Sequence, residues 1–151
     1  MMSLKKQVNY NIMDALLLKV VSQERQLLSK TIEKVSVPTA GGEVTILPNH
    51  IGLFAKVVAG EVRYDLDKHS ESIVVSDGFV NVSPDGRVIV MVDSATYARD
   101  ISLQKAKRAI KEAKEAMKQS IDRKELMMAE ASLRLAMLEV RIAKKTKKRK
   151  I

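Results

Sequence analysis

The first two thirds of the chain carry short runs of mainly apolar residues mixed with polar ones. β-Branched residues dominate these runs, and turn-forming residues such as Gly, Pro, Asn and Asp separate them. β-Branched side chains suit the pleated, half-buried surface of a strand. The runs that predict strands are Leu16–Val21, Gln26–Thr31, Val35–Val37, Glu43–Leu47, Glu61–Leu66, Ser72–Ser76, Phe79–Ser83 and Arg87–Val92.

The turn signals lie in the same part of the chain, since all six glycines and all three prolines fall within residues 38–86. Asp77-Gly78 and Pro84-Asp85-Gly86 predict hairpin turns, because Gly adopts the positive φ that such turns require. Pro38–Gly42 and Pro48–His50 are predicted to be loops, and Lys68-His69 a solvated hairpin tip. Eight to ten short strands with no helix between them favour an antiparallel β-sandwich or flattened barrel.

Beyond Asp100 the chain contains neither Gly nor Pro, and apolar residues recur every three or four positions, which is one face of a helix. Ser102 is predicted to cap the first helix, and Asp122 with Glu125 resembles a capping box that begins a second. The short break at Ser120–Asp122 favours two antiparallel helices. The two apolar seams are Leu103, Ala106, Ile110, Ala113 and Met117, and then Leu126, Ala129, Leu133, Ala136 and Val140.

These patterns predict a β + α fold: an N-terminal antiparallel β-sandwich of about eight to ten strands, followed by a C-terminal antiparallel two-helix hairpin. We expect a flexible extension at residues 1–13, the sandwich at 14–99, the hairpin at 100–143 and a basic tail at 144–151.

The net charge of +9 belongs entirely to the C-terminal third. Residues 1–99 contain 11 basic and 11 acidic residues, whereas residues 100–151 contain 16 basic and 7 acidic ones. This asymmetry indicates two modules with different partners. A lysine stripe lies beside the first apolar seam and fits either a solvated helix face or a docking stripe for an acidic partner. The stripe consists of Lys107, Lys111, Lys114 and Lys118.

Little in the composition points to catalysis. The chain has no Cys, two His and 3% aromatic residues, so thiolate metal sites and Cys nucleophiles are excluded. No phosphate-binding loop or nucleophile elbow is present, and no apolar run reaches the ~18 residues of a membrane span. We therefore predict no catalytic residue, no cofactor and no metal ion. Taken alone, His50 fits a hydrogen bond within its loop, and Glu43 fits an exposed strand position.

One string of residues is more specific. Val35-Ser36-Val37-Pro38-Thr39-Ala40-Gly41-Gly42-Glu43-Val44-Thr45-Ile46-Leu47-Pro48-Asn49-His50, followed by Gly60-Glu61-Val62-Arg63, resembles the central stretch of the epsilon subunit of bacterial F-type ATP synthase. Phe79–Val82 and Val88–Ala95 resemble a strand pair of that family and its exit toward the helices. The usual Gly-Gly before Phe is Asp77-Gly78 here. The resemblance covers about residues 15–143.

The resemblance implies a rotor component of the proton-translocating enzyme that has no active site of its own. In this family the β domain contacts the gamma subunit at the foot of the central stalk and the polar loops of the c ring. The positions that match the ring-facing edge are Glu43 and His50, with the loop between Pro38 and Gly42. The resemblance also implies a peripheral membrane protein at the cytoplasmic face of the cell membrane.

The family's helical hairpin either folds against the sandwich or extends toward the alpha and beta subunits, where it obstructs rotation in the hydrolysis direction. If this chain behaves as that family does, the lysine stripe is expected to meet an acidic segment of the catalytic beta subunit when the hairpin extends. The residues themselves leave an alternative, a β-sandwich adaptor whose basic hairpin binds nucleic acid. Such a protein is expected to carry basic residues across its β surface, whereas residues 1–99 are neutral overall.

Some members of the family bind ATP through an Ile/Leu-Asp-x-x-Arg-Ala-x-x-Ala signature at the first helix. Here Ser102 stands in place of the Asp and Lys105 in place of the Arg. An ammonium holds a ligand at one point, whereas a guanidinium holds it at two. Leu135 and Glu139 fall where basic residues would hold phosphates. We therefore expect weak or no ATP binding.

Overall fold

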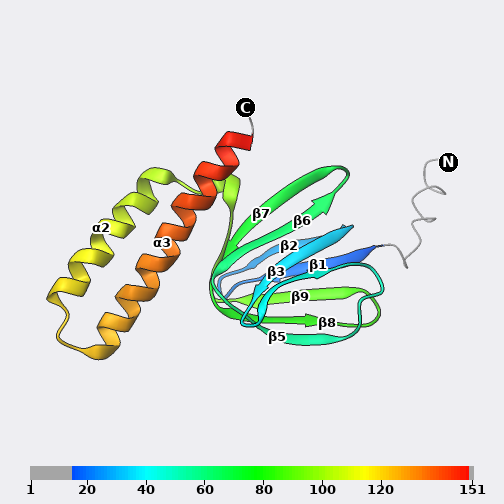
Figure 1. Cartoon of the computed structure of the whole chain (residues 1–151), viewed down its shortest axis with the longest axis horizontal. Coiled ribbons are helices and arrows are strands. Elements are labelled where there is room, and N and C mark those ends of the chain that lie inside the picture. Colours follow the sequence, from blue (N-terminus) through cyan, green and yellow to red (C-terminus); the bar gives the residue numbers. More distant parts are fainter. Residues whose placement is uncertain (1–14, 150–151) are drawn as a thin grey trace. The chain divides into compact units, whose positions relative to one another are not determined.

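The computed structural model describes residues 15–149, and the chain divides into two compact units between Ala95 and Thr96 (Figure 1). The first unit is a β-sandwich and the second a helical hairpin, which confirms the predicted fold class. The division falls slightly before the predicted boundary at residue 99. The predicted N-terminal extension, residues 1–13, lies outside the described residues.

Short strands build the first unit. Its described strands are β1 (Leu16–Val21), β2 (Gln26–Ile32), β3 (Lys34–Thr39), β4 (Gly42–Ile46), β5 (Leu53–Val57), β6 (Gly60–Leu66), β7 (His69–Val75), β8 (Gly78–Val82) and β9 (Arg87–Val92). Buried positions alternate with exposed or intermediate ones along β1 and β9, whereas β3 and β7 bury successive residues. The three-residue β10 (Ala95–Tyr97) spans the boundary between the units.

One continuous sheet folds over to form the two layers of the sandwich (Figure 1). The strand order is β7-β6-β3-β5-β8-β9-β1-β2, and β4 pairs with β3. β3 joins the layers because it changes partner along its length: Val35 pairs with Tyr64 of β6, and Thr39 with Val57 of β5. These strand pairs are antiparallel, with the exception of β1 and β9, which run parallel.

Aliphatic side chains from both layers fill the space between them. Leu18, Val20, Val88 and Val90 are fully buried on the adjacent strands β1 and β9. Tyr64 is the largest side chain in this core and is 2% exposed. Burial of each such side chain contributes about 1.5–3 kcal/mol, so this core holds the sandwich together.

The turn prediction at Pro84-Asp85-Gly86 is confirmed. Gly86 has a φ of 94° in the β8–β9 turn, which only Gly adopts without strain. The predicted tip at Lys68-His69 lies one residue earlier. Asp67 and Lys68 have φ values of 50° and 65°, the geometry of a tight hairpin tip, and His69 begins β7.

The prediction of a loop over Pro38–Gly42 was wrong in its extent, because β3 continues through Thr39 and β4 begins at Gly42. The turn is closed by the Thr39 hydroxyl, which donates to the carbonyl of Gly42 at 2.6 Å. Pro38 lies within β3, and its carbonyl accepts a hydrogen bond from the Val58 N–H at 3.1 Å.

The prediction of a hairpin turn at Asp77-Gly78 was also wrong. Gly78 begins β8, which pairs with β5 and β9 rather than with β7, and its φ is not positive. Glycine is required there for a different reason. A Cβ at Gly78 would overlap the carbonyl oxygen of Met91 and lie 2.7 Å from the Cα of Val92. The absent side chain therefore permits close approach of β8 and β9.

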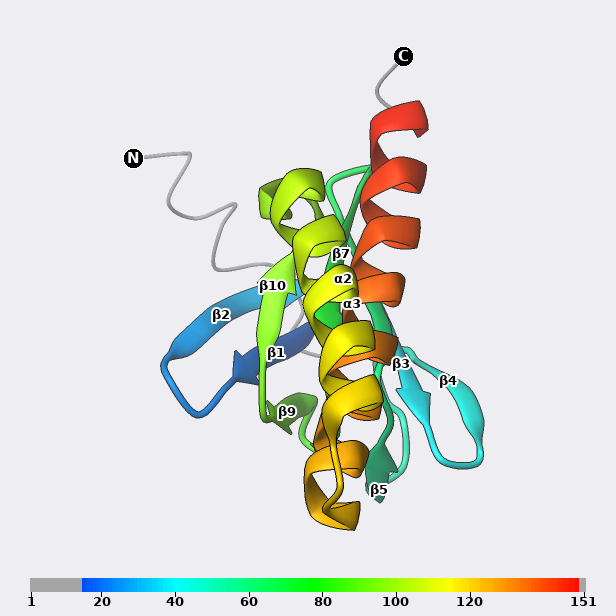
Figure 2. The same ribbon diagram turned by 90° about the vertical axis from the view of Figure 1, so that its left-hand side faces the viewer.

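The second unit contains the short 3-10 turn η2 (Ala98–Asp100), then α2 (Leu103–Gln119) and α3 (Arg123–Arg149). The Ser102 hydroxyl caps α2 by accepting from the Lys105 N–H at 3.3 Å. Asp122 accepts from the Lys124 N–H at 3.1 Å at the start of α3. The two helices run antiparallel, as predicted (Figure 2). The buried residues of the two helices are Ala106 and Ala113 on α2, and Ala129, Ala136, Leu138, Ile142 and Ala143 on α3.

Helix α3 is longer than the sequence pattern predicts. The hairpin is expected to end at residue 143, with a separate basic tail after it, yet α3 continues to Arg149. Lys and Arg are good helix formers, and positive charge near a helix C-terminus interacts favourably with the helix dipole. The apolar periodicity that marks the rest of the helix ends earlier than the helix does.

Candidate interaction surfaces

Glu43 lies on β4, which pairs with β3, and its side chain is exposed. Its carboxylate accepts hydrogen bonds from Nη2 of Arg63 at 3.0 and 3.2 Å. Arg63 belongs to β6, on the other side of β3, so the ion pair crosses that strand. Glu43 is thus an exposed strand residue with a defined orientation at this edge of the sandwich.

His50 lies in the connection between β4 and β5, at the end of a tight turn. The turn is closed by a hydrogen bond from the His50 N–H to the carbonyl of Leu47 at 3.2 Å, and Asn49 has a φ of 68°. The ring Nδ1 lies 2.7 Å from the carbonyl oxygen of Ile51, so it donates its proton there. His50 therefore stabilises its loop, and Nε2 is the ring atom left to face another molecule.

An apolar patch on the outer face of the sandwich was not predicted from the sequence. Phe54 of β5 and Phe79 of β8 stack with ring centroids 5.4 Å apart and an interplanar angle of 14°. Met91 of β9 lies opposite Phe79 in the strand register. These side chains are 66%, 47% and 43% exposed, respectively. A stacked aromatic pair with a neighbouring Met on the surface is typical of a protein interface.

A signal for this patch was present in the strand pattern. Phe79 and Met91 occupy the outward positions of strands whose inward positions are Val80, Val90 and Val92. Large apolar residues at outward positions indicate that another molecule covers this face of the sheet. Phe54 carried no such signal, because β5 itself was not among the predicted strands. Ala55 and Lys56 weaken the β-strand pattern of that segment.

The lysine stripe lies on α2, and all four of its side chains are exposed. Exposure is compatible with both interpretations of the stripe, a solvated face and a docking surface.

The residues at the ATP-signature positions have structural roles in the hairpin. Ser102 caps α2, and Lys105 is exposed. Leu135 and Glu139 are half-buried on α3. Burial raises the pKa of the Glu139 carboxyl above its ordinary value of 4.5. A partly desolvated carboxylate at this position disfavours a neighbouring phosphate.

Polar side chains on β6 and its neighbours pair with one another. The Ser70 hydroxyl donates to Asp65 at 2.6 Å, and the Ser72 hydroxyl donates to Glu61 at 2.6 Å. The bond from Ser70, followed by the ammonium of Lys34 at 3.3 Å, holds the pKa of Asp65 below its ordinary value. These carboxylates are structural partners, and the residues that the structure describes contain no group of three or more potential metal ligands.

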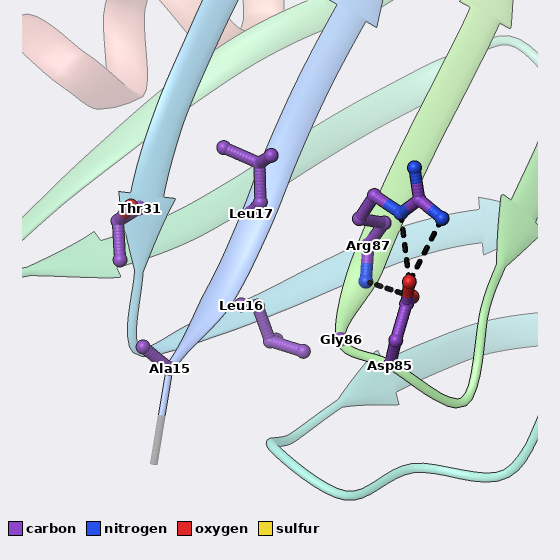
Figure 3. Close-up of a pocket in the computed structure, with 7 residues that line it drawn as sticks. All are labelled: Ala15, Leu16, Leu17, Thr31, Asp85, Gly86 and Arg87. Atoms are coloured by element: carbon purple, nitrogen blue, oxygen red, sulfur yellow. Dashed lines mark hydrogen bonds and ion pairs between the residues drawn. The ribbon is translucent and has the colours of Figure 1, made fainter. Parts of the chain in front are cut away.

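A pocket opens at one end of the sandwich, between the start of β1 and the β8–β9 turn (Figure 3). Arg87 and Asp85 line it and pair with each other, with Nε and Oδ2 2.9 Å apart. The hydrogen bond from Arg87 lowers the pKa of Asp85. The Gly86 carbonyl accepts from the Leu17 N–H at 2.9 Å. The two charged side chains of the pocket thus form an ion pair with each other. A guanidinium paired with a carboxylate does not provide a nucleophile activated by a base.

Within residues 15–149, none of the helices is both long and apolar enough to cross a membrane. Three surfaces stand out on the described residues: the Phe54–Phe79 patch, the edge that carries Glu43 and His50, and the lysine stripe.

Comparison with known proteins identifies the relatives of this chain. A family model described as "ATP synthase, Delta/Epsilon chain, beta-sandwich domain" matches residues 15–98. The ATP synthase epsilon chain of Dehalococcoides mccartyi is 38% identical over 137 residues, which cover 90% of this chain and 97% of that protein. The epsilon chain of Syntrophobacter fumaroxidans is 31% identical over 129 residues, with 85% and 96% coverage.

Solved structures with the same fold come from mitochondrial ATP synthases. A chain in the OSCP/F1/c-ring structure from Euglena gracilis superposes with a TM-score of 0.72 at 22% identity, covering 86% of this chain and 82% of that one. A chain in the central stalk/c-ring structure from Tetrahymena thermophila superposes with a TM-score of 0.56 at 11% identity. The sandwich, the hairpin and the sequence identity agree, and the chain belongs to the ATP synthase epsilon chain family.

Proposed function

We propose that this protein is a non-catalytic central-stalk subunit of a proton-translocating F-type ATP synthase. In this role it couples the gamma subunit to the c ring during ATP synthesis, and its helices restrain ATP hydrolysis. The observation that carries the proposal is the match to an epsilon chain over 90% of this chain, because that match spans both the sandwich and the hairpin. The nucleic-acid alternative has no comparable support.

The Phe54–Phe79 patch is proposed as the contact with the gamma subunit. A rotor subunit must transmit torque through a stable interface, and the centres of such interfaces are apolar and rich in aromatic residues. Phe54, Phe79 and Met91 form the exposed aromatic and thioether cluster on the described part of the sandwich. Burial of these side chains by gamma would remove apolar surface from water at both sides of the contact.

The edge that carries Glu43 and His50 is proposed as the contact with the polar loops of the c ring. Glu43 presents a carboxylate oriented by Arg63, and the loop of His50 is closed by its own hydrogen bonds. Both groups are therefore preorganised for polar contacts. This arrangement suits a polar loop as partner better than an apolar surface.

The lysine stripe is proposed to meet an acidic segment of the alpha and beta subunits when the hairpin extends. Its four exposed charges supply attraction that depends on ionic strength. We place the protein at the cytoplasmic face of the membrane as a peripheral component, because the partners proposed here are membrane-bound through the c ring.

Co-purification tests the proposed function. The full chain, tagged and expressed in its native cells, is expected to bring down alpha, beta and gamma subunits from detergent-solubilised membranes. A tagged chain with Phe54→Ser and Phe79→Ser serves as the matched comparison and should recover far less of these subunits. Recovery of nucleic acid, or of proteins unrelated to ATP synthase, would overturn the proposal.

A further inference from the structure

The last six residues of α3, residues 144–149, carry a dense group of positive charges and are called the basic end of α3 below. Five of these six residues are basic, and the sequence after Glu139 contains no acidic residue. The helix continues through the whole segment, so helical geometry sets the direction in which each side chain leaves the axis. The exposed lysines of the segment are Lys144, Lys145, Lys147 and Lys148.

These four lysines cover one half of the helix circumference. Successive residues of an α-helix are rotated by about 100°, which spreads the four over an arc of about 160°. Their order around the arc is Lys147, Lys144, Lys148 and Lys145. The opposite half carries Ile142 and Ala143, which are only 2% and 3% exposed. One side of this part of the helix is therefore packed within the protein, and the basic side faces solvent.

The positive charge of the basic end exceeds what the helix itself requires. Cations near the C-terminus of a helix interact favourably with the helix dipole, but this effect is confined to the last turn. Lys144 lies three positions before Lys147 and four before Lys148, and like charges at this spacing repel each other. An external group of anions would relieve this repulsion, so the segment is suited to binding one.

The side chains of the basic end indicate a partner that is recognised by charge alone. Residues 144–149 include no apolar residue, so the apolar stripe of an amphipathic helix would have nothing to cover there. Four of the five cations are lysines, and a lysine ammonium lacks the planar fork with which arginine holds one phosphate at two points. This surface therefore fits many loosely held anions better than one specifically bound group.

The arc of lysines also distinguishes between two common polyanions. A nucleic-acid strand presents its phosphates along one line, so it would meet only part of a half-circle of cations. The headgroups of a fluid bilayer diffuse separately and can gather around all four lysines. The long methylene stems of lysine also let the ammonium groups reach a common plane. A bilayer surface is therefore the better match to this geometry.

We propose that the basic end of α3 binds the surface of an anionic phospholipid bilayer by charge attraction, without inserting into it. The choice of a bilayer rests on the proposed function, because a central-stalk subunit works beside a membrane. The contact itself goes beyond that function, which reaches the membrane only through the c ring. It is also separate from the lysine stripe, which lies on α2.

Sedimentation of the purified full chain with lipid vesicles tests the proposal. Vesicles of phosphatidylglycerol mixed with phosphatidylcholine are the probe, and vesicles of pure phosphatidylcholine are the control. The chain is expected to sediment with the first and not with the second. It should leave the vesicles at about 1 M salt, where the Debye length is about 3 Å. Equal binding to both kinds of vesicle, or binding that resists salt, would overturn the proposal.

A triple variant locates the contact on the basic end. Lys144→Gln, Lys147→Gln and Lys148→Gln together remove three charges and preserve good helix formers. Each cation near an anionic surface accounts for about five-fold in affinity, so vesicle binding is expected to weaken roughly hundred-fold. Circular dichroism should show unchanged helix content. Unchanged vesicle affinity in this variant would contradict the proposal.

A matched variant on the sandwich separates a local contact from the effect of net charge. Lys30→Gln, Lys56→Gln and Lys68→Gln remove the same charge from exposed positions of the first unit. Charges more than a Debye length from the contact are largely screened, so the affinity for vesicles should change by less than about three-fold. Equal weakening by the two triple variants would show attraction by net charge and overturn the proposal.

A short DNA duplex is the last probe, added to chain that is already bound to vesicles. If the duplex displaces the chain more effectively than further phosphatidylglycerol vesicles at the same phosphate concentration, nucleic acid replaces the bilayer as the partner and the proposal is wrong. The vesicle assay uses the chain alone, so its failure leaves co-purification with ATP synthase subunits unaffected. Failure of co-purification likewise leaves the vesicle result in place.

Discussion

Arg63 and Glu43 form an ion pair across strand β3, in which one guanidinium nitrogen donates to both carboxylate oxygens at 3.0 and 3.2 Å. Both side chains are partly exposed, so the pair contributes only about 0.2–1 kcal/mol to stability. The main effect of the ion pair is to orient the Glu43 carboxylate, because Arg63 holds it at the edge proposed to face the c ring.

Glu43→Gln is therefore expected to separate stability from coupling. The midpoint of urea unfolding should change little, whereas ATP-driven proton pumping by the assembled enzyme should fall, because the contact loses its charge. Arg63→Gln, which frees the carboxylate but retains it, is expected to have a smaller effect on pumping. Full pumping activity in the Glu43→Gln enzyme would contradict a role for this edge.

The Phe54–Phe79 patch predicts a binding defect without a folding defect. Stacking of exposed rings contributes about 0.5–1.5 kcal/mol, so Phe54→Ser with Phe79→Ser should lower the melting temperature only modestly. Affinity for purified gamma subunit, measured by surface plasmon resonance, should fall by at least about ten-fold, as is typical when a central aromatic anchor is lost. Ile121→Ser removes a fully exposed apolar side chain from the hairpin and is the control. Unchanged gamma binding in the double variant would place the interface elsewhere.

The lysine stripe predicts an effect on ATP hydrolysis rather than on assembly. Gln at Lys107, Lys111, Lys114 and Lys118 removes four charges and preserves good helix formers. At about 0.2–1 kcal/mol per screened contact, the change shifts a folded/extended balance by roughly ten-fold or more. ATPase activity should rise and depend less on salt, while subunit stoichiometry stays constant. If hydrolysis is unaltered, the stripe is a solvated face.

The substitutions in the ATP signature predict weak or no nucleotide binding. Lys105 offers a single-point contact, and the half-buried Glu139 opposes phosphate. Isothermal titration of the purified chain with MgATP is expected to give no saturable heat at micromolar nucleotide. A micromolar dissociation constant would show that the hairpin tolerates these changes.

Glu139 predicts a pH dependence of hairpin stability. Burial raises its pKa above 4.5 in the folded state, so the folded chain binds the proton more tightly than the unfolded chain. This residue's contribution to stability therefore declines as the pH rises from about 4.5 through the folded pKa. Glu139→Gln removes that decline, and urea unfolding at pH 7 should show a higher midpoint than the wild type. At about pH 3.5, where both states are protonated, the two proteins should unfold alike. A gain of equal size at both pH values would contradict this account.

Local patterns determined the elements of this fold because each is a property of neighbouring residues. The apolar run Leu16–Val21, which ends at the polar residues of 22–25, placed β1 at its observed bounds, and the spacing of Ala106 and Ala113 predicted the buried seam of α2. Ser102 could be named as a cap because a hydroxyl at that position satisfies an N–H in the same turn. The neutral first unit and basic second unit were equally visible in the sequence.

Tertiary structure decided what depends on residues far apart in the chain. Glycine is needed at position 78 because the backbone of Met91 and Val92 on β9 lies too close for a side chain. A turn prediction from neighbouring residues does not include such a contact between strands. β5 is a strand because β8 pairs with it, despite its weak intrinsic preference. The stacking of Phe54 on Phe79 and the reach of Arg63 to Glu43 arise only once the strands are in register. Several strands or helices contribute residues to each surface of this kind. The position of such a surface therefore depends on strand order and helix direction, and no single segment of the sequence determines it.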